Sequence, residues 1–234
     1  MGKNKLSKWA ELETFRNVIQ PGISDDFGQS HPLKGNWKRE IFNNFNPVVL
    51  ELACGKGEYS TSLASRFPSR NFIGIDIKGA RMWRGAKTAA EENLNNVAFL
   101  RTRIEFINSF FAEDEVDEIW IIFPDPHPGK RNSNKRLTCP WFLNTYRNFL
   151  KNNGLIHLKT DNKELFDYTE SLIARNNLET FFSTRDLYAD NPEDDILSIH
   201  THYENSFLNK GHKINYLSFR LNKEKVISDG TPAR

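Results

Sequence analysis

The stretch PVVLELACGKGEYS, residues 47–60, decides how this chain can fold. Its first half is a nearly continuous apolar run, which is typical of a strand buried on both faces of a parallel sheet. Gly55 and Gly57 then allow the backbone to turn sharply and to approach a ligand closely. The segment YSTSLASRF predicts a helix after the turn, and the N-terminus of such a helix presents backbone amide donors. The stretch therefore predicts a strand, a glycine turn and a helix that can hold a ligand.

The same alternation continues along the chain. Apolar runs predict further strands at residues 71–77, 97–104, 116–123 and 154–160. Helical patterns accompany them at residues 78–93, 139–151 and 162–177. Two late strands, 181–188 and 214–221, are expected to form an antiparallel edge, with a partly helical segment between them. Strands separated by helical segments predict an α/β fold with a mostly parallel sheet and helices on both faces.

We expect one main domain. No internal repeat or low-complexity tract is visible, and 234 residues with 38% hydrophobic and 26% charged side chains suit a single core. Residues 1–45 combine basic clusters, Pro and Gly with weak periodicity, which predicts a partly ordered N-terminal arm. Residues 46–223 then form the main domain, and residues 224–234 form a C-terminal tail.

Bulk composition restricts the partners. The formal net charge is only +2, so binding to a polyanion would need a local basic patch. Cys54 and Cys139 stand far apart without the spacing of metal ligands, and we expect no metal and two reduced thiols. The first residues lack the apolar stretch of a signal peptide, and no run approaches the roughly 20 apolar residues of a membrane span. A cytoplasmic protein without a membrane partner is therefore expected.

Two carboxylates next to the glycine turn indicate the kind of ligand. Ser60 stands where a nicotinamide-binding fingerprint would have its third glycine, which weakens a dinucleotide site. Asp76, at the end of the second strand, can accept hydrogen bonds from both ribose hydroxyls of an adenosine ligand. Glu51 lies inside the first strand, where burial is costly unless a cation pairs with it. The alternative interpretation is local: Glu51 binds backbone amides of the turn, and Asp76 caps the next helix.

Five motifs carry a resemblance to a known family. They are ELACGKGEYS (51–60), GIDIKGARMWRGAKTA (74–89), FPDPHPGKRNSNKRL (123–137), LKTDN (158–162) and THYENSFLNKG (201–211). In this order and spacing the chain resembles the bacterial tRNA (guanine-N7)-methyltransferase family over about residues 32–221. The resemblance implies a three-layer, Rossmann-like class I methyltransferase sandwich, with a mostly parallel seven-stranded sheet and an antiparallel edge strand. It also implies S-adenosylmethionine as cofactor and a guanine of tRNA, at position 46 in the variable loop, as acceptor.

The resemblance also assigns site residues. Asp125 matches the acidic active-site residue of the family. The cofactor would be bound by Glu51, Gly55, Gly57, Asp76, Arg103 and Ile104. The substrate would be bound by Lys130, Arg131, Asp161, Thr201, Tyr203 and Glu204.

Three places depart from the family pattern. Arg103 and Ile104 stand where the family has an Asn or Asp followed by a small or acidic residue, so a side-chain contact with the adenine is in question there. His127 replaces the usual Trp, and we expect it to stack or pack as the indole does. Gly129 replaces the usual Lys, which leaves Lys130 and Arg131 as the nearest basic residues.

The chemistry of the acceptor agrees with these residues. N7 of guanine carries a lone pair and no proton, so its methylation needs positioning and no general base. Asp125 would accept hydrogen bonds from guanine N1 and the exocyclic amine. Residues 126–160 contain seven Lys or Arg and no acidic residue, which suits an RNA backbone, although a solvated basic surface is the alternative.

Other functions remain to be distinguished. A methyltransferase of another RNA or of a small molecule would keep Glu51 and Asp76, but a small-molecule enzyme would not need the basic segment. A nicotinamide dehydrogenase would explain the glycines but not Glu51. A non-catalytic RNA-binding subunit would have little use for Asp125. The sequence is compatible with a monomer or a homodimer.

Overall fold

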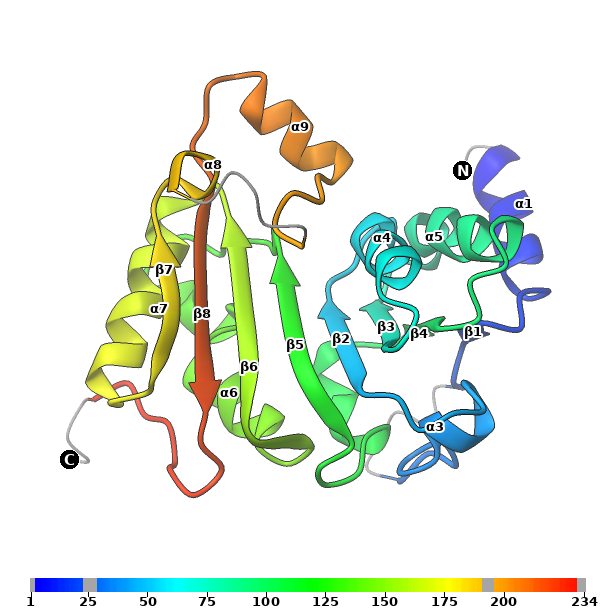
Figure 1. Cartoon of the computed structure of the whole chain (residues 1–234), viewed down its shortest axis with the longest axis horizontal. Helices are drawn as coiled ribbons and strands as arrows, with labels where there is room; N and C mark the ends of the chain where they lie inside the picture. Colours follow the sequence, from blue (N-terminus) through cyan, green and yellow to red (C-terminus); the bar gives the residue numbers. More distant parts are fainter. Residues whose placement is uncertain (1–2, 23–28, 191–195, 231–234) are drawn as a thin grey trace. The chain divides into compact units, whose positions relative to one another are not determined.

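The computed structural model describes residues 3–22, 29–190 and 196–230, with the backbone alone at residues 3, 4, 202 and 203. Figure 1 shows the whole chain. It divides into two compact units, residues 1–116 (unit 1) and residues 117–234 (unit 2).

Unit 1 is built on four parallel strands in the order β1, β4, β3, β2. They are β1 (Val18–Ile19), β4 (Val97–Arg101), β3 (Asn71–Asp76) and β2 (Val48–Leu52). Every residue of β2 and β3 is buried, which explains why their sequences are mostly apolar. The register pairs Leu52 with Ile75 and Asp76 with Arg101, so the carboxyl ends of β2, β3 and β4 meet at one edge.

The helices of unit 1 pack closely on this sheet. They are α1 (Lys3–Leu12), α3 (Trp37–Glu40), α4 (Glu58–Arg66), α5 (Gly79–Glu91) and the 3₁₀-helix η1 (Ile104–Ser109). A Cβ atom added to Gly57 would lie 2.4 Å from the Phe99 ring, and one added to Gly85 would lie 2.7 Å from the Lys56 carbonyl oxygen. Glycine at both positions therefore lets α4 and α5 approach each other above Phe99.

Part of the N-terminal arm is fixed to unit 1 by a buried carboxylate. Glu115 accepts hydrogen bonds from the backbone amides of Gly35 and Ala112, each at 2.8 Å, and of Trp37 at 3.2 Å. The Trp37 indole, which is fully buried, donates to the Phe110 carbonyl oxygen at 2.8 Å and stacks on Phe111. The arm thus contributes core side chains of its own.

Unit 2 contains the strand order β5, β6, β8, β7. These strands are β5 (Val116–Ile122, whose first residue belongs to unit 1), β6 (Leu150–Thr160), β8 (Asn215–Leu221) and β7 (Thr180–Thr184). The arrows of β5 and β6 point the same way in Figure 1, whereas β8 runs antiparallel to both β6 and β7. The helical segments are η2 (Lys130–Lys135), α6 (Pro140–Tyr146), α7 (Lys163–Arg175), α8 (Leu187–Asp190) and α9 (His202–Leu208).

The observed elements confirm the predicted α/β fold and its antiparallel edge. The described residues add an eighth strand, because the arm contributes β1, which is too short to leave a periodic signal. Two predicted strands are too long. The strand predicted at 97–104 is β4, which ends at Arg101 because the chain turns into η1 from Ile104. The strand predicted at 181–188 is β7, which ends at Thr184 because the chain turns into α8 from Leu187. The expected helix at 139–151 stops at Tyr146, and its last residues already belong to β6.

Candidate active site

The glycine turn of unit 1 connects β2 to α4. Ala53, Gly55 and Gly57 have φ angles of +58°, +56° and +69°, a left-handed conformation that favours glycine. A Cβ atom on Gly55 would meet nothing closer than the Ala53 carbonyl oxygen, at 4.0 Å. Gly57 is packed against Phe99, as described above. Gly55 therefore leaves open space for a ligand, whereas Gly57 is required by the packing of the unit itself.

Glu51 is a buried carboxylate with incomplete compensation. Ser60 donates two hydrogen bonds to its Oε2 atom, one from the backbone amide at 2.8 Å and one from the hydroxyl. Within the described part of the chain, Oε1 accepts none. Burial raises the pKa of Glu51 to about 8, and the hydrogen bonds from Ser60 oppose this rise without cancelling it. A cationic ligand would stabilise the ionised carboxylate.

Asp76 lies at the carboxyl end of β3 and braces the turn. Its Oδ2 accepts a hydrogen bond from the Gly55 amide at 2.9 Å, and its Oδ1 accepts one from the Lys78 amide at 2.7 Å. These are the local contacts that the alternative interpretation expected, and the bond from Ser60 to Glu51 is another. A carboxylate has about four acceptor positions, so local bonding and ligand binding are compatible.

Arg103 and Ile104 follow β4. Arg103 is exposed, and its Nη2 atom lies 3.3 Å from Glu105 Oε1. Ile104 is half-buried and begins η1. The Arg103 side chain thus pairs with a neighbour in the chain while it stays more than half exposed.

Asp125 belongs to a loop of unit 2 that follows β5. The loop begins at Phe123, with φ +46°, whose amide donates to the Lys159 carbonyl oxygen at 2.8 Å. Pro124 is buried and Asp125 is exposed. The buried proline thus anchors the loop while the next carboxylate remains accessible. We call residues 123–129 the acceptor loop.

A buried arginine fastens the acceptor loop. The Arg136 side chain is 4% exposed, and its Nε and Nη2 atoms donate to the His127 carbonyl oxygen at 3.2 and 3.1 Å. Its Nη2 also lies 2.5 Å from Glu164 Oε1, which accepts the Gly129 amide at 2.9 Å as well. The guanidinium lies 4.5 Å from the ring centroid of Tyr168. Arg136 and Glu164, which we call the loop clamp, hold both His127 and Gly129.

The basic residues next to the loop are accessible. Lys130, Arg131 and Lys135 lie on η2 and are all exposed. Gly129 has a φ angle of +80°, a left-handed conformation that favours glycine, and no atom lies within 4 Å of an added Cβ. His127 is half-buried with φ +44°, so its backbone has an unusual conformation of its own.

The remaining predicted substrate residues differ in accessibility. Asp161 is half-buried between β6 and α7. Thr201 is the N-cap of α9 and forms a capping box with Glu204, and both are buried. The Tyr203 side chain lies outside the described residues. Asp161 is therefore open to a ligand, while Thr201 and Glu204 are used within the chain.

A second buried ion pair explains the position of Glu204. Lys159 is fully buried, and its Nζ atom lies 2.8 Å from Glu204 Oε1. Nζ also donates to the carbonyl oxygens of Leu197 and Ile199 at 3.0 and 3.2 Å. The Tyr188 hydroxyl donates to the same oxygen of Glu204, and burial next to this carboxylate raises the pKa of Tyr188. This network ties the segment before α9 to the end of β6.

Sequence reasoning missed several of these residues. The sequence motif marks Ser60 only as a residue in place of a third glycine, but both of its donors bind Glu51. The loop clamp joins residues 28 positions apart, and no local pattern reveals it. Lys159 did leave a signal, since it is a lysine at the end of an apolar strand.

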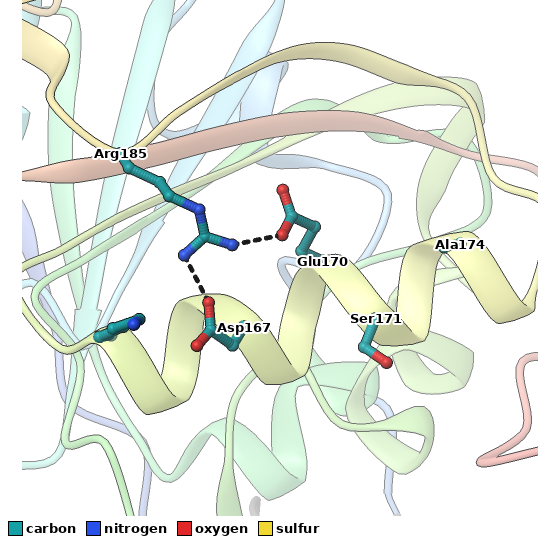
Figure 2. A pocket seen from close by; sticks show the side chains of 6 residues that line it. Asp167, Glu170, Ser171, Ala174 and Arg185 are labelled. Atoms are coloured by element: carbon teal, nitrogen blue, oxygen red, sulfur yellow. Dashed lines mark hydrogen bonds and ion pairs between the residues drawn. The ribbon is translucent and has the colours of Figure 1, made fainter.

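The groove in Figure 2 lies on the outer side of α7 and is separate from the predicted site residues. It is lined by Lys163, Asp167, Glu170, Ser171, Ala174 and Arg185. Arg185 forms ion pairs with Asp167 at 2.5 Å and Glu170 at 2.6 Å. In the described ranges, three or more His, Cys, Asp or Glu side chains never gather as a metal ion would require. The described helices include none with the length and apolarity needed to cross a bilayer.

Comparisons with known proteins give relatives over nearly the whole chain. The family model described as "Putative methyltransferase" matches residues 45–217. A tRNA (guanine-N(7)-)-methyltransferase of Bacteroides fragilis (strain YCH46) is 49% identical over 98% of this chain and 90% of the relative. The enzyme of the same name from Christiangramia forsetii is 48% identical over 94% of this chain and 98% of its own length.

Solved structures share the fold. The crystal structure of the 16S rRNA methyltransferase KamB has a TM-score of 0.59 at 13% identity, over 79% of this chain and 92% of that chain. The 16S rRNA (adenine(1408)-N(1))-methyltransferase from Catenulisporales acidiphilia has a TM-score of 0.55 at 15% identity, over 87% and 97%. These likenesses support the class I methyltransferase fold.

The raised pKa of Glu51 predicts a pH-dependent stability. The unfolded chain ionises this carboxyl near its ordinary pKa of 4.5, whereas the folded, ligand-free chain keeps it protonated up to about pH 8. The free energy of unfolding should therefore fall between about pH 5 and 8, by on the order of 3 kcal/mol from this group. Glu51→Gln has no carboxyl to titrate at this position, so its free energy of unfolding should fall less than that of the wild type between pH 5 and pH 8. Urea unfolding at these two pH values measures the difference. Glu92→Gln, at an exposed position, is the control. Equal pH dependence of wild type and Glu51→Gln would contradict the assignment.

The loop clamp predicts unequal effects of two arginine substitutions. Arg136→Ala leaves the part-buried His127 carbonyl oxygen without its donor and should lower the free energy of unfolding by about 2 kcal/mol. Arg185→Ala removes an exposed arginine, 50% accessible and also paired with carboxylates, and should cost less than about 1 kcal/mol. Urea unfolding measures both. The clamp is refuted if Arg136→Ala costs no more than Arg185→Ala.

Proposed function

Because the chain belongs to the tRNA (guanine-N(7)-)-methyltransferase family, we propose that Glu51 and Asp76 of unit 1 hold its methyl donor and that Asp125 of unit 2 holds the target guanine. The reaction is the transfer of a methyl group to N7 of a guanine in tRNA. S-adenosylmethionine is the cofactor, and when bound it supplies an electrophilic methyl group on a sulfonium. The observation that carries the proposed donor site is the incomplete compensation of Glu51.

The residues of the glycine turn fit such a cofactor. Oε1 of Glu51 needs a positively charged or hydrogen-bond-donating partner, and an α-ammonium group is both. Asp76 can accept ribose hydroxyls while it keeps its bonds to the turn. The open space at Gly55 allows close approach of a ligand. The backbone at Arg103 and Ile104 would meet the adenine.

Asp125 is suited to hold guanine without acting as a base. Its carboxylate is exposed, and the loop that carries it is fixed by the clamp. A carboxylate placed there accepts hydrogen bonds from guanine N1 and the exocyclic amine, a donor pair that adenine lacks. The same negative charge stabilises the ring as it becomes positive during methyl transfer.

The other predicted substrate residues divide into two groups. Lys130 and Arg131 are exposed and would bind phosphates of the tRNA. Asp161 and Tyr203 would contact the tRNA near the target guanine. Thr201 and Glu204 would act by positioning, because their side chains cap α9 and that of Glu204 also pairs with Lys159. The domain boundaries at 45/46 and 223/224, a cytoplasmic location and a monomeric or homodimeric state belong to the same proposal.

Mapping of the methylated base tests this proposal. Purified protein should transfer labelled methyl groups from S-adenosylmethionine to unmodified tRNA, and cleavage at N7-methylguanine should locate them at position 46. A tRNA in which that guanine is replaced by adenine is the matched control and should remain unlabelled. Methylation at another guanine would refute the variable-loop assignment. Labelling of small acceptors alone would refute tRNA as the substrate.

Substitution of Asp125 separates the binding of the target guanine from the binding of the methyl donor. Asp125→Ala should lower kcat/KM for tRNA by at least about 100-fold, because the guanine loses its orienting acceptor. The affinity for S-adenosylmethionine should change less than about twofold, since the proposed donor residues are untouched. Asp167→Ala, which removes another accessible carboxylate of unit 2, is the control. Unimpaired turnover of Asp125→Ala would remove this residue from the site.

A further inference from the structure

Cations and tryptophans gather on the surface that α1 and α5 form in unit 1. Figure 1 shows α1 lying beside α5. We call this surface the basic–aromatic face. Its members are Lys5, Lys8, Trp9, Arg81, Trp83, Arg84, Lys87 and Arg101.

Trp83 is the centre of one half of the face. Lys8 Nζ lies 4.5 Å from its ring, Lys87 Nζ 5.2 Å and Arg84 Cζ 5.5 Å. The indole Nε1 donates to Glu11 Oε2 at 2.8 Å, which fixes the ring. Three cations are thus held around one immobilised aromatic ring.

Trp9 organises the other half of the face. Arg101 Cζ lies 4.5 Å from its ring and Lys5 Nζ lies 5.9 Å from it. The Trp9 side chain is 39% exposed, and Leu6 on the same helix is 64% exposed. Arg101 pairs in register with Asp76, so the face reaches the edge of the sheet that carries the proposed donor site.

The face concentrates positive charge. Between Lys5 and Leu12, along α5 and at Arg101 there are six Lys or Arg and two Glu, a surplus of four against a net charge of +2 for the whole chain. The two Glu are engaged with Lys87 at 2.9 Å and Arg84 at 2.8 Å. Among the described residues, no carboxylate lies within ion-pair distance of Lys5, Lys8 or Arg81. Clustered like charges repel one another, and an anionic partner would offset this repulsion.

We propose that the basic–aromatic face binds the sugar-phosphate backbone of the tRNA substrate, as a surface additional to the basic segment of unit 2. This proposal rests on the proposed function. Lysine and arginine bind phosphate, and the exposed Trp9 ring among them suits an unpaired base, which is the combination that RNA-binding surfaces use. The face has two exposed large apolar side chains, Leu6 and Trp9. This apolar surface is small for a helix that inserts into a lipid surface, so the face favours RNA over a membrane.

Paired charge reversals test the face. The double variant Lys8→Glu/Arg81→Glu changes two of its cations, and the double variant Arg39→Glu/Lys225→Glu makes the same change of charge at exposed positions elsewhere. The KM for tRNA of the first variant should rise about tenfold, with kcat at saturating tRNA and the KM for S-adenosylmethionine within about twofold of wild type. The slope of log(kcat/KM) against log salt should decrease in magnitude by about two. The control variant should match the wild type in both measurements.

Further outcomes keep the proposal refutable. If Lys8→Glu/Arg81→Glu lowers the melting temperature, the milder Lys5→Gln/Lys8→Gln variant should still raise the KM for tRNA about threefold. An unchanged KM for tRNA and an unchanged salt slope in a folded variant would overturn the proposal. Loss of binding to vesicles of phosphatidylglycerol and phosphatidylcholine, without a change in KM, would assign the face to a membrane surface and also overturn it. If wild-type protein fails to methylate tRNA at all, the proposed function fails instead.

Discussion

A charged side chain buried at the carboxyl end of a strand needs compensation, and this chain meets that need in two ways. Lys159, at the end of β6, is fully buried and bound to Glu204 and two carbonyl oxygens. Glu51, near the end of β2, has Ser60 alone, and its pKa is raised to about 8. A compensated charge needs no further partner, whereas an undercompensated carboxyl stays protonated near neutral pH until a cationic ligand favours its ionised form. The same physical requirement therefore separates a structural residue from a candidate ligand-binding one.

The predictable part of the fold is the part encoded by local patterns. The run at 47–52 and the glycines that follow it indicated the strand, turn and helix, and Glu51 was notable because a carboxylate interrupts an apolar run. The partners of these residues were not predictable. Arg136 meets Glu164 28 positions away, and Lys159 meets Glu204 through the folding of α9 onto β6. Such pairs depend on tertiary contacts, which one sequence does not display.

The acceptor loop shows why the prolines alone do not explain its conformation. Phe123 and His127 have φ angles of +46° and +44°, which are unusual for residues other than glycine and cost about 1–3 kcal/mol each. Proline restricts its own φ but provides no hydrogen bond to hold its neighbours. The Phe123 amide is held by the Lys159 carbonyl oxygen, and the His127 carbonyl oxygen is held by Arg136. The loop is thus kept in a strained conformation by contacts at both ends, with Asp125 between them.

The distribution of perturbed acids agrees with the chemistry of the reaction. Burial raises the pKa of Glu51, which belongs to unit 1 and to the proposed donor site. Enzymes that transfer protons tune the pKa of a group near the acceptor toward neutrality. N7 of guanine has no proton to lose, so an acceptor site for it needs orientation and negative charge. The structure fixes the backbone around Asp125 and leaves its carboxylate accessible, which is what such a reaction requires.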